Sequence, residues 1–442
     1  MKVFYRLVIP FICVVLLLCA SNTQWSRDNW NNIVEADGKG YYAYLPALFI
    51  YNDLNFTFFD SIEKKYPNPR LYYDYRVGKQ GRQANKYFAG TALAIMPFFF
   101  IAHATAKCLG MEADGYSKIY PVCVNIAAIF YLLVGLYYLR KVLRIYDVSE
   151  GIISFILIAI TFATNLFYYA VCEPAMSHVY SFAFITAFIY FLHTFYEQPS
   201  KRSFLILCAL YGVILLIRPV NGLIILIIPF AAIEKERFLW LFSYFRKQVT
   251  LVVAGFIIVS AIVSIQLIVY KIQTGSFWVN SYGTETFNWL SPHPIDFLIS
   301  YKKGLLLYTP LVLISLTGLY VLFKNNKFQF YSLSFFLVVT VYVLSSWWSW
   351  WYGGSFGSRV CIEYYALIAI LIGVTYNYLK QPWFRALYSG LIVCALLVCQ
   401  IQTYQYRYYF IHWEKMDKEH YWRVFMRIDQ LGKKNPNSDL LN

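Results

Sequence analysis

Two carboxylates lie two positions apart at the start of the stretch 35–49, which follows the first apolar segment of the chain. An aspartate can act as a general base by accepting the proton of a hydroxyl group. Glu35 stands close enough to Asp37 to orient it, or to raise its pKa by like-charge repulsion. In an extended segment both side chains would point to one face. Asp37-Gly38 is also common turn chemistry, so a solvated loop is the simpler alternative.

Glycine and tyrosine residues follow these carboxylates directly. Gly38 and Gly40 are expected to form a turn in which the backbone can approach a bound ligand closely. Tyr41 and Tyr42 are expected to line the same site. Pro46 is expected in the first turn of a short interfacial helix, where its missing N–H does no harm.

Four cations are predicted to lie near the membrane on its extracytoplasmic side, where the positive-inside rule does not favour positive charge. They are Arg218, Lys302, Lys303 and Arg359. Together they indicate an anionic ligand, because phosphate suits both the planar fork of arginine and the point charge of lysine. The two lysines could instead extend to lipid head groups. Arg359 could instead pair with Glu363 one helical turn further on.

The segment 347–359 combines an aromatic cluster with glycines and serines. Backbone N–H groups at Gly353 and Gly354 could hold oxyanions, although the aromatic residues alone would suit an interfacial belt. Glu173 and His178 occupy another loop on the same side and are candidate lining residues. His178 could instead be held by a neighbouring side chain.

The tetrapeptide Glu-Ala-Asp-Gly occurs at 35–38 and again at 112–115. Four residues can match by chance in a chain of this length, so no internal repeat is inferred, but Asp114 becomes a minor site candidate. The carboxylates of this region could hold a divalent cation such as Mg²⁺ or Mn²⁺. No ligand spacing requires one, and no metal site is predicted.

The composition excludes an ordinary soluble domain, because 59% of the 442 residues are hydrophobic and only 14% are charged. Several apolar runs are long enough to cross a bilayer, and the 41 tyrosines and 12 tryptophans suit the two interfacial belts. The net charge of +15 does not indicate nucleic acid, since most of the excess falls in short loops between apolar runs. The sequence therefore predicts an all-α polytopic membrane protein.

About eleven transmembrane helices are predicted, at roughly 8–20, 118–139, 151–168, 177–195, 203–217, 220–233, 250–271, 304–323, 329–346, 362–379 and 386–403. With the N-terminus in the cytoplasm, this assignment places five basic clusters inside, as the positive-inside rule requires. They are Arg140/Lys141/Arg144, Lys201/Arg202, Lys235/Arg237/Arg246/Lys247, Lys324/Lys327 and Lys380/Arg385.

The assignment depends on the segment 88–106, which is apolar and long enough to span the membrane. If it spanned, the clusters around 140–144 and 201–202 would lie outside. We therefore expect it to dip into the outer leaflet and return, as part of a long first extracytoplasmic loop at 21–117 with interfacial helices. Residues 404–442 are then a short extracytoplasmic tail.

At these residues the sequence resembles the GT-C glycosyltransferases, in particular the branch of protein O-mannosyltransferases and lipid A aminoarabinose transferases. The resemblance is sharpest at 35–42, 218–221, 300–310 and 351–357. The Lys-Pro-Pro-Leu element often seen in the first loop of that branch is absent, and 85–88 stands roughly in its place. The resemblance implies a GT-C-like transmembrane catalytic domain over residues 1–403.

It also implies an inverting transferase that moves a hexosyl or pentosyl unit from a polyprenyl-phosphate donor to an extracytoplasmic acceptor, which could be a glycan, a lipid or a protein. Such enzymes reside in the plasma (inner) membrane with the site on the outer face, and Asp37 fits their expected base. The residues agree with this chemistry, because a phosphate leaving group needs no strong acid, only a base on the acceptor hydroxyl and cations near the phosphate.

Two alternatives stay open. A flippase or transporter of lipid-linked glycans would be expected to show inverted repeats or ionisable residues at mid-membrane. An O-antigen polymerase or ligase would act at the same place, but such enzymes typically carry their large outer loop late in the chain.

Overall fold

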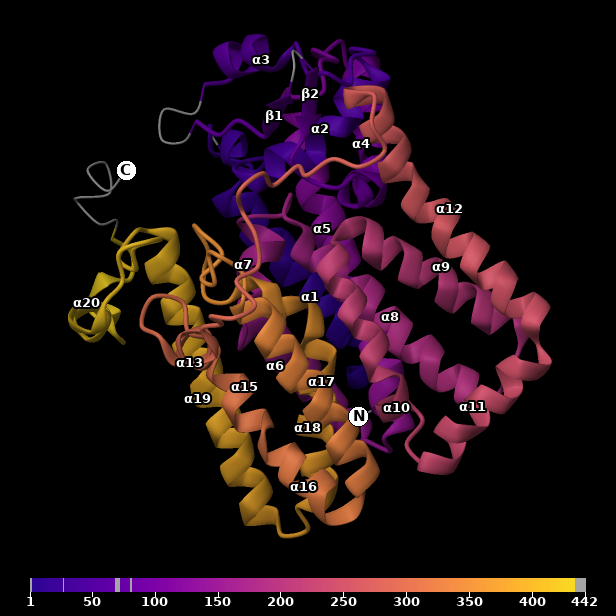
Figure 1. Ribbon diagram of the computed structural model, residues 1–442. Coiled ribbons are helices and arrows are strands. Elements are labelled where there is room, and N and C mark those ends of the chain that lie inside the picture. The colour runs from indigo at the N-terminus through magenta and orange to yellow at the C-terminus, as the bar shows by residue number, and fades with distance from the viewer. Residues whose placement is uncertain (1, 27, 68–71, 80–81, 434–442) are drawn as a thin grey trace.

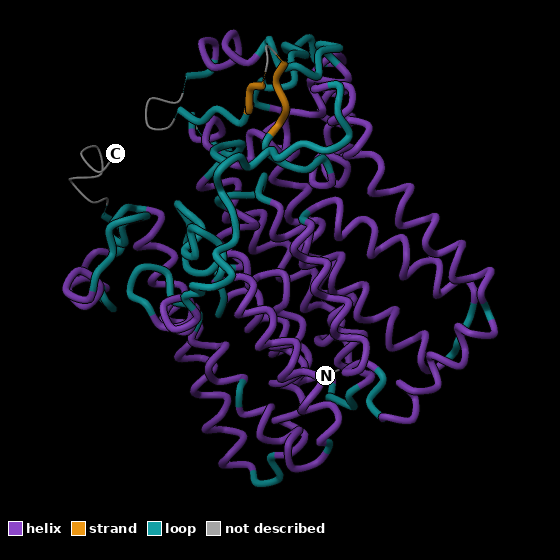
Figure 2. Tube along the Cα trace, viewed as in Figure 1, coloured by secondary structure: helices purple, strands orange, loops and turns teal. Residues whose placement is uncertain are grey.

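The computed structural model describes residues 2–26, 28–67, 72–79 and 82–433, and most of them are helical. The long helices run side by side as a bundle (Figure 1). Long loops and a small β-hairpin gather at one end of this bundle, whereas short turns join the helices at the other end (Figure 2). We call these the looped end and the short-turn end. The expected all-α polytopic architecture is confirmed.

The N-terminal part forms α1 (Lys2–Thr23), η1 (Asn29–Asn32), α2 (Asp37–Phe49), α3 (Phe59–Lys65), β1 (Arg76–Lys79), β2 (Arg82–Asn85) and α4 (Gly90–Cys108). The two strands are antiparallel, with Arg76 opposite Asn85 and Lys79 opposite Arg82. The described residues between α1 and α4 lie at the looped end (Figure 1).

The helix expected to begin near Pro46 begins at Asp37 instead, so Pro46 lies in its last turns and not in its first. Ala36 directly precedes the helix and has a positive φ of 48°, so the chain changes direction at Ala36 and the helix begins at Asp37. The expectation of an extended segment, with Glu35 and Asp37 on one face, was therefore wrong. So was the expectation of a Gly38–Gly40 turn.

The rest of the chain forms α5 (Ile119–Ile145), α6 (Glu150–Phe162), α7 (Leu166–Val171), α8 (Ser177–Glu197), α9 (Lys201–Ile217), η2 (Pro219–Ile227), α10 (Ile228–Ala231), α11 (Lys235–Lys247), α12 (Val249–Thr274), α13 (Pro294–Ile299), α14 (Leu305–Tyr308), α15 (Pro310–Ser315), α16 (Thr317–Asn325), α17 (Lys327–Ser345), η3 (Arg359–Tyr364), α18 (Tyr365–Tyr378), α19 (Pro382–Arg407), α20 (Lys418–Val424) and η4 (Ile428–Gln430). Among the described residues, seven helices are long and apolar enough to cross a membrane, and four apolar helices are shorter.

The predicted spans coincide with these helices, except that three of them are interrupted. The span expected at 151–168 is divided into α6 and α7, and the one at 304–323 into α14, α15 and α16. Pro310 causes one of these breaks, since it has no N–H to continue the helix. The span expected at 220–233 is largely a 3₁₀-helix that follows a break at Arg218-Pro219.

The loops that carry the basic clusters meet at the short-turn end. Asn377 donates to the carbonyl of Tyr146 over 2.7 Å, and Asn326 donates to the carbonyl of Ile233 over 3.0 Å. These contacts join loops that the positive-inside rule assigned to one side of the membrane. Which side of a bilayer this end faces stays a prediction.

The segment 88–106, which was expected to dip into the membrane and return, forms most of one continuous helix, α4. Both of its ends nevertheless lie toward the looped end. At its start, the N–H of Ala89 donates to Gln266 near the end of α12, over 2.8 Å. Near its other end, His103 Nδ1 is 2.7 Å from the hydroxyl of Tyr120, at the start of α5. The helix therefore does not run to the short-turn end.

Burial differs strongly among the long helices. α8 and α18 form the packed centre, whereas α12 exposes apolar residues such as Phe256, which is 73% exposed. A helix that exposes apolar side chains and carries its one charge, Lys271, in the last turn is typical of a lipid-facing position. The buried helices α8 and α18 begin at the looped end, so the loops that precede them are anchored to the packed centre of the bundle.

Candidate functional site

A cavity of about 1450 Å³ opens at the looped end. Its walls come from six parts of the chain, approximately 22–41, 72–88, 168–178, 217–220, 282–287 and 347–359, and a seventh wall is formed by 406–414. Single small-molecule sites usually measure roughly 300–1,000 Å³. The cavity is therefore large enough for two substrates at once.

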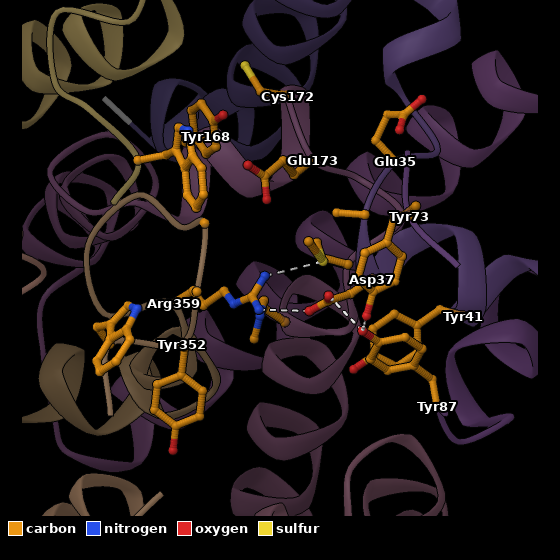
Figure 3. A pocket seen from close by; sticks show the side chains of 18 of the residues that line it. Glu35, Asp37, Tyr41, Tyr73, Tyr87, Tyr168, Cys172, Glu173, Tyr352 and Arg359 are labelled. Carbon is orange, nitrogen blue, oxygen red and sulfur yellow. Dashed lines mark hydrogen bonds and ion pairs between the residues drawn. The ribbon is translucent and has the colours of Figure 1, made fainter. Parts of the chain in front are cut away.

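Asp37 lies in this cavity at the first turn of α2 and is held from two sides (Figure 3). Arg359 Nη2 donates to Asp37 Oδ2 over 2.7 Å, and the hydroxyl of Tyr87 donates to Oδ1 over 2.7 Å. Burial alone raises the pKa of Asp37, but the Arg359 charge and the Tyr87 hydrogen bond outweigh it, so the pKa lies below its usual value. Asp37 is consequently ionised near neutral pH.

The glycines of α2 serve helix packing. A Cβ on Gly38 would lie 2.7 Å from the Cβ of Ala175, and a Cβ on Gly40 would lie 2.3 Å from the ring of Tyr87. Gly40 thus allows Tyr87 to lie against the helix and reach Asp37. The expected approach of a ligand to this backbone is not what the glycines provide, because both are buried.

Arg218 is anchored below the cavity by two buried residues. Its Nη1 donates to Glu363 over 2.8 Å and lies 3.2 Å from His178 Nδ1. His178 Nδ1 is also 3.1 Å from the same Glu363 oxygen. Glu363 therefore pairs with Arg218, and the alternative pairing with Arg359 is wrong. Arg218 and His178 both line the cavity.

The two lysines expected at the phosphate do not line the cavity directly. Lys302 pairs with Glu414 at 2.7 Å and lies 3.5 Å above the ring centre of Trp351. Lys303 is only 2% exposed and donates to the carbonyl of Ser355. Burial lowers the pKa of Lys303 to about 7. Both lysines hold the wall formed by the aromatic and glycine-rich segment.

That segment reaches the cavity through Gly353 and Gly354, as expected. Gly353 has φ 64°, a left-handed conformation that favours glycine. Further along, the hydroxyl of Tyr169 accepts the N–H of Phe356 over 3.0 Å, and Asn165 donates to the Phe356 carbonyl over 2.9 Å. These contacts fix the loop just before Arg359.

Glu173 lies in the turn between α7 and α8 and also lines the cavity (Figure 3). Burial raises the pKa of Glu173 to about 7, although the nearby Arg359 charge acts in the opposite direction. Its Oε2 atom is buried and has no hydrogen-bond partner. Such an atom is costly to leave unsatisfied, so it marks a place where a ligand could bind.

Comparison with solved structures identifies the architecture. The crystal structure of ArnT from Cupriavidus metallidurans, bound to undecaprenyl phosphate, superimposes with a TM-score of 0.55 at 11% sequence identity. The match covers 92% of this chain and 69% of ArnT. The chain therefore shares the overall fold of ArnT. No protein-family model matches the sequence, and no curated protein matches it.

Within this ArnT-like fold the cavity unites seven predicted site residues: Glu35, Asp37, Tyr41, Glu173, His178, Arg218 and Arg359, together with Gly353 and Gly354. Glu35 is turned away from Asp37 and lies 3.6 Å from Lys39 (Figure 3). Tyr42 and Asp114 do not line the cavity. The hydroxyl of Tyr42 donates to Gly115, and Asp114 pairs with Lys65 at 2.8 Å.

Sequence reasoning missed several lining residues of the cavity. Lys86 lines it and pairs with Glu285 at 2.7 Å, while Tyr73 and Tyr87 cover Asp37. Lys86 and Tyr87 lie in the segment that replaces the Lys-Pro-Pro-Leu element, and this position was the available signal.

The last helix also contributes more than expected. α19 continues to Arg407, which lines the cavity and donates to the carbonyl of Thr23 over 2.9 Å. Trp413 lines the cavity as well. Residues between 406 and 414 therefore form part of the cavity wall, while 434–442 lies outside the described residues.

Throughout the described part of the chain, no three His, Cys, Asp or Glu side chains are grouped closely enough to hold a metal ion. The prediction of an optional divalent cation stays untested.

Proposed function

We propose that this chain is an inverting glycosyltransferase that moves a hexosyl or pentosyl unit from a polyprenyl-phosphate donor to an acceptor on the extracytoplasmic side of the plasma membrane. One observation carries the proposal: a half-buried aspartate and two arginines converge on one large cavity in an ArnT-like fold. The ArnT structure contains undecaprenyl phosphate, which supports a lipid phosphate as the donor carrier.

Arg218 and Arg359 are the proposed partners of the donor phosphate. Arg218 is held through one nitrogen by Glu363, so the position of its guanidinium is fixed before the ligand arrives. Arg359 lies in the same cavity, beside Asp37 (Figure 3). Cations fixed where negative charge develops stabilise the transition state without reorganising. Lys86 adds a third cation at the wall.

Lys302 and Lys303 keep a supporting role in the proposal. They hold Trp351 and Ser355, so they position the loop that leads to Arg359. Their effect on the phosphate passes through this loop, which differs from the direct contact that their sequence position suggested.

Asp37 is the proposed general base. The acceptor oxygen forms a bond to the anomeric carbon, and its proton moves to Asp37. The bond from the anomeric carbon to the phosphate oxygen breaks, and the phosphate keeps that electron pair. A single displacement inverts the anomeric centre.

The ion pair with Arg359 lowers the pKa of Asp37 and so weakens it as a base before the donor binds. A phosphate bound to Arg359 competes with Asp37 for the guanidinium. The carboxylate then loses part of its stabilisation, its pKa rises, and it becomes a better base beside the acceptor. Donor binding and base activation are coupled in this scheme.

The test uses purified protein in lipid nanodiscs with undecaprenyl phosphate carrying radiolabelled mannose, glucose, galactose or arabinose. Delipidated cell-envelope material serves as the acceptor. We expect label to pass from the lipid to the envelope fraction with at least one donor, and undecaprenyl phosphate to be released in equal amount. Movement of labelled lipid between leaflets without release of the carrier would support a flippase and contradict the proposal.

A further inference from the structure

Glu173 is the cavity carboxyl that the proposed reaction does not use. It lies in a turn held by three side chains. Gln24 donates to the Cys172 carbonyl over 3.0 Å, Asn125 donates to the Ala170 carbonyl over 2.9 Å, and Tyr180 donates to the Pro174 carbonyl over 3.0 Å. A side chain on such a support keeps its place in the cavity wall.

The other carboxyls among the described lining residues each have a cation beside them. The pairs are Asp37 with Arg359 at 2.7 Å, Glu35 with Lys39 at 3.6 Å, Glu285 with Lys86 at 2.7 Å and Glu414 with Lys302 at 2.7 Å. Among these described residues, Glu173 alone has no ion pair. It also keeps a buried oxygen without a hydrogen-bond partner.

A buried acceptor of this kind favours a ligand that brings a hydrogen-bond donor. Arg359 and Lys303 already bring positive charge near Glu173, while Asp37 brings negative charge, so the carboxyl needs no further cation. A neutral hydroxyl fits the surroundings better. Tyr168 and Tyr406 line the same part of the cavity, with ring centres 5.2 Å apart. A hydrogen bond from Tyr168 also acts on the Glu173 carboxyl, while Oε2 stays without a partner and lies beside the two rings.

The place of Glu173 indicates which substrate it meets. A donor phosphate at Arg359 brings the anomeric carbon, and hence the sugar ring, next to that arginine. Glu173 faces the same part of the cavity (Figure 3). We propose that Glu173 binds a hydroxyl group of the donor sugar and thereby selects donors that carry this hydroxyl. This inference rests on the proposed function and adds a specificity-determining residue to it.

Glu173 would discriminate between donor sugars because a buried oxygen without a hydrogen-bond partner is costly. A donor that lacks the hydroxyl leaves the carboxyl oxygen unsatisfied in the closed complex, and sites built on a buried hydrogen bond reject such analogues strongly. A hydrogen bond to a charged group accounts for about a 10-fold to 100-fold difference in affinity.

The test measures dissociation constants by native mass spectrometry for undecaprenyl phosphate alone and for undecaprenyl phosphate carrying mannose, glucose, galactose or arabinose. The wild-type protein should bind at least one sugar-bearing lipid more tightly than the bare lipid. Glu173→Ala should reduce that advantage by about tenfold or more. It should leave the affinity for bare undecaprenyl phosphate unchanged.

Glu173→Gln keeps the shape of the side chain and one acceptor oxygen, so it should lose less of the preference for sugar-bearing lipid over bare lipid. This variant keeps the test informative if Glu173→Ala does not fold. Glu112→Ala, a carboxyl of the first loop that does not line the cavity, is the matched control and should behave as wild type. At one ring position, the lipid carrying the deoxy sugar should bind wild type more weakly than the lipid carrying the parent sugar. Glu173→Ala should bind these two lipids with equal affinity.

Equal loss of affinity for bare and sugar-bearing lipids in Glu173→Ala would overturn the inference and leave the lipid-phosphate site standing. An unchanged sugar advantage in Glu173→Ala would overturn it too. Failure of the wild-type protein to bind any of these lipids would instead overturn the proposed function, and the inference with it.

Discussion

Arg359 donates a hydrogen bond to Asp37 over 2.7 Å, although the two residues lie 322 positions apart in the sequence. The contact joins the first long loop to the glycine-rich loop near the end of the chain. It places the proposed base and a proposed phosphate-binding cation in one ion pair. In the proposed reaction, the donor phosphate competes with Asp37 for this arginine, and donor binding frees the proposed base.

The first prediction concerns that arginine. Arg359→Ala should weaken binding of undecaprenyl phosphate by about 10-fold to 100-fold, as expected for a lost charge-assisted hydrogen bond. Arg359→Lys keeps the charge without the planar fork, so its loss should be smaller. Native mass spectrometry of the purified protein measures both. Arg237→Ala, at the short-turn end where Arg237 pairs with Glu197, is the control and should not change the affinity. An unchanged affinity in Arg359→Ala would separate Arg359 from the phosphate.

The second prediction uses the pKa of Glu173, which burial raises from 4.5 to about 7. A carboxyl whose pKa is raised by folding stabilises the protein below its unfolded pKa, and that contribution is lost as the pH rises through the folded value. Glu173→Gln stays neutral at every pH. The melting temperature of this variant, relative to wild type, should therefore rise between pH 4.5 and pH 8, by about 1–4 °C.

The measurement is a thermal-unfolding series in detergent across this pH range. Glu112→Gln is the control, because Lys65 and Tyr66 lower the pKa of Glu112 and so should give no such rise. A flat difference between Glu173→Gln and wild type would show that Glu173 is ionised at no cost in the folded protein.

The third prediction connects helix packing to the site. Gly40→Ala would place a Cβ 2.3 Å from the ring of Tyr87, so the ring must move away from Asp37. Overpacking of this kind costs about 1–3 kcal/mol, and transfer activity should fall with it. In Gly78→Ala the new Cβ has nothing within 4 Å, so this hairpin variant should keep both stability and activity. Melting temperature and transfer rate are compared for the two variants. Equal behaviour would mean that Tyr87 does not depend on Gly40.

The fourth prediction concerns orientation in the membrane. Ser149→Cys, placed at the exposed start of α6 in a Cys108→Ser background, should resist membrane-impermeant thiol reagents in intact cells and react after the cells are opened. The reason is that the short-turn end carries the basic clusters, which favour the cytoplasmic side. Labelling of Ser149→Cys in intact cells would place this end outside and reverse the assignment of every loop.

Much of the fold could be predicted from the sequence because hydropathy and charge act locally. Apolar runs such as 250–271 and 386–403 required helices, and the basic clusters between such runs fixed how the segments alternate. The starts of short helices were harder. α2 begins nine residues before Pro46, because Ala36 turns the chain and the neighbours of Gly38 and Gly40 stabilise the helix by packing. No local pattern contains that information.

The site was predictable in its residue types but not in its pairing. Charge placement identified Arg218 and Arg359, and the first loop identified Asp37. The partners of these residues come from distant segments: Glu363 holds Arg218, so the alternative that paired Glu363 with Arg359 is wrong. Lys303 was expected at the phosphate, but it is buried against Ser355 because the loop folds over it.

The fifth prediction concerns the base and its neighbour. Asp37→Asn keeps size and hydrogen bonding but removes basicity, so turnover should fall about 10²–10⁴-fold while donor binding survives. Glu35→Gln should have a milder effect, because Glu35 lies beside Lys39 and is turned away from Asp37. Asp114→Asn is the matched control, since Asp114 stands in the same tetrapeptide but outside the cavity.

The most direct test of the central claim is mass spectrometry of surface glycans in a strain that lacks the gene, complemented in turn with wild type, Asp37→Asn and Asp114→Asn at equal protein amounts in the membrane. The account predicts that at least one envelope species loses a single hexose or pentose in the deletion strain, that wild type and Asp114→Asn restore it, and that Asp37→Asn does not. Full restoration by Asp37→Asn, or surface glycans identical in all four strains, would contradict it.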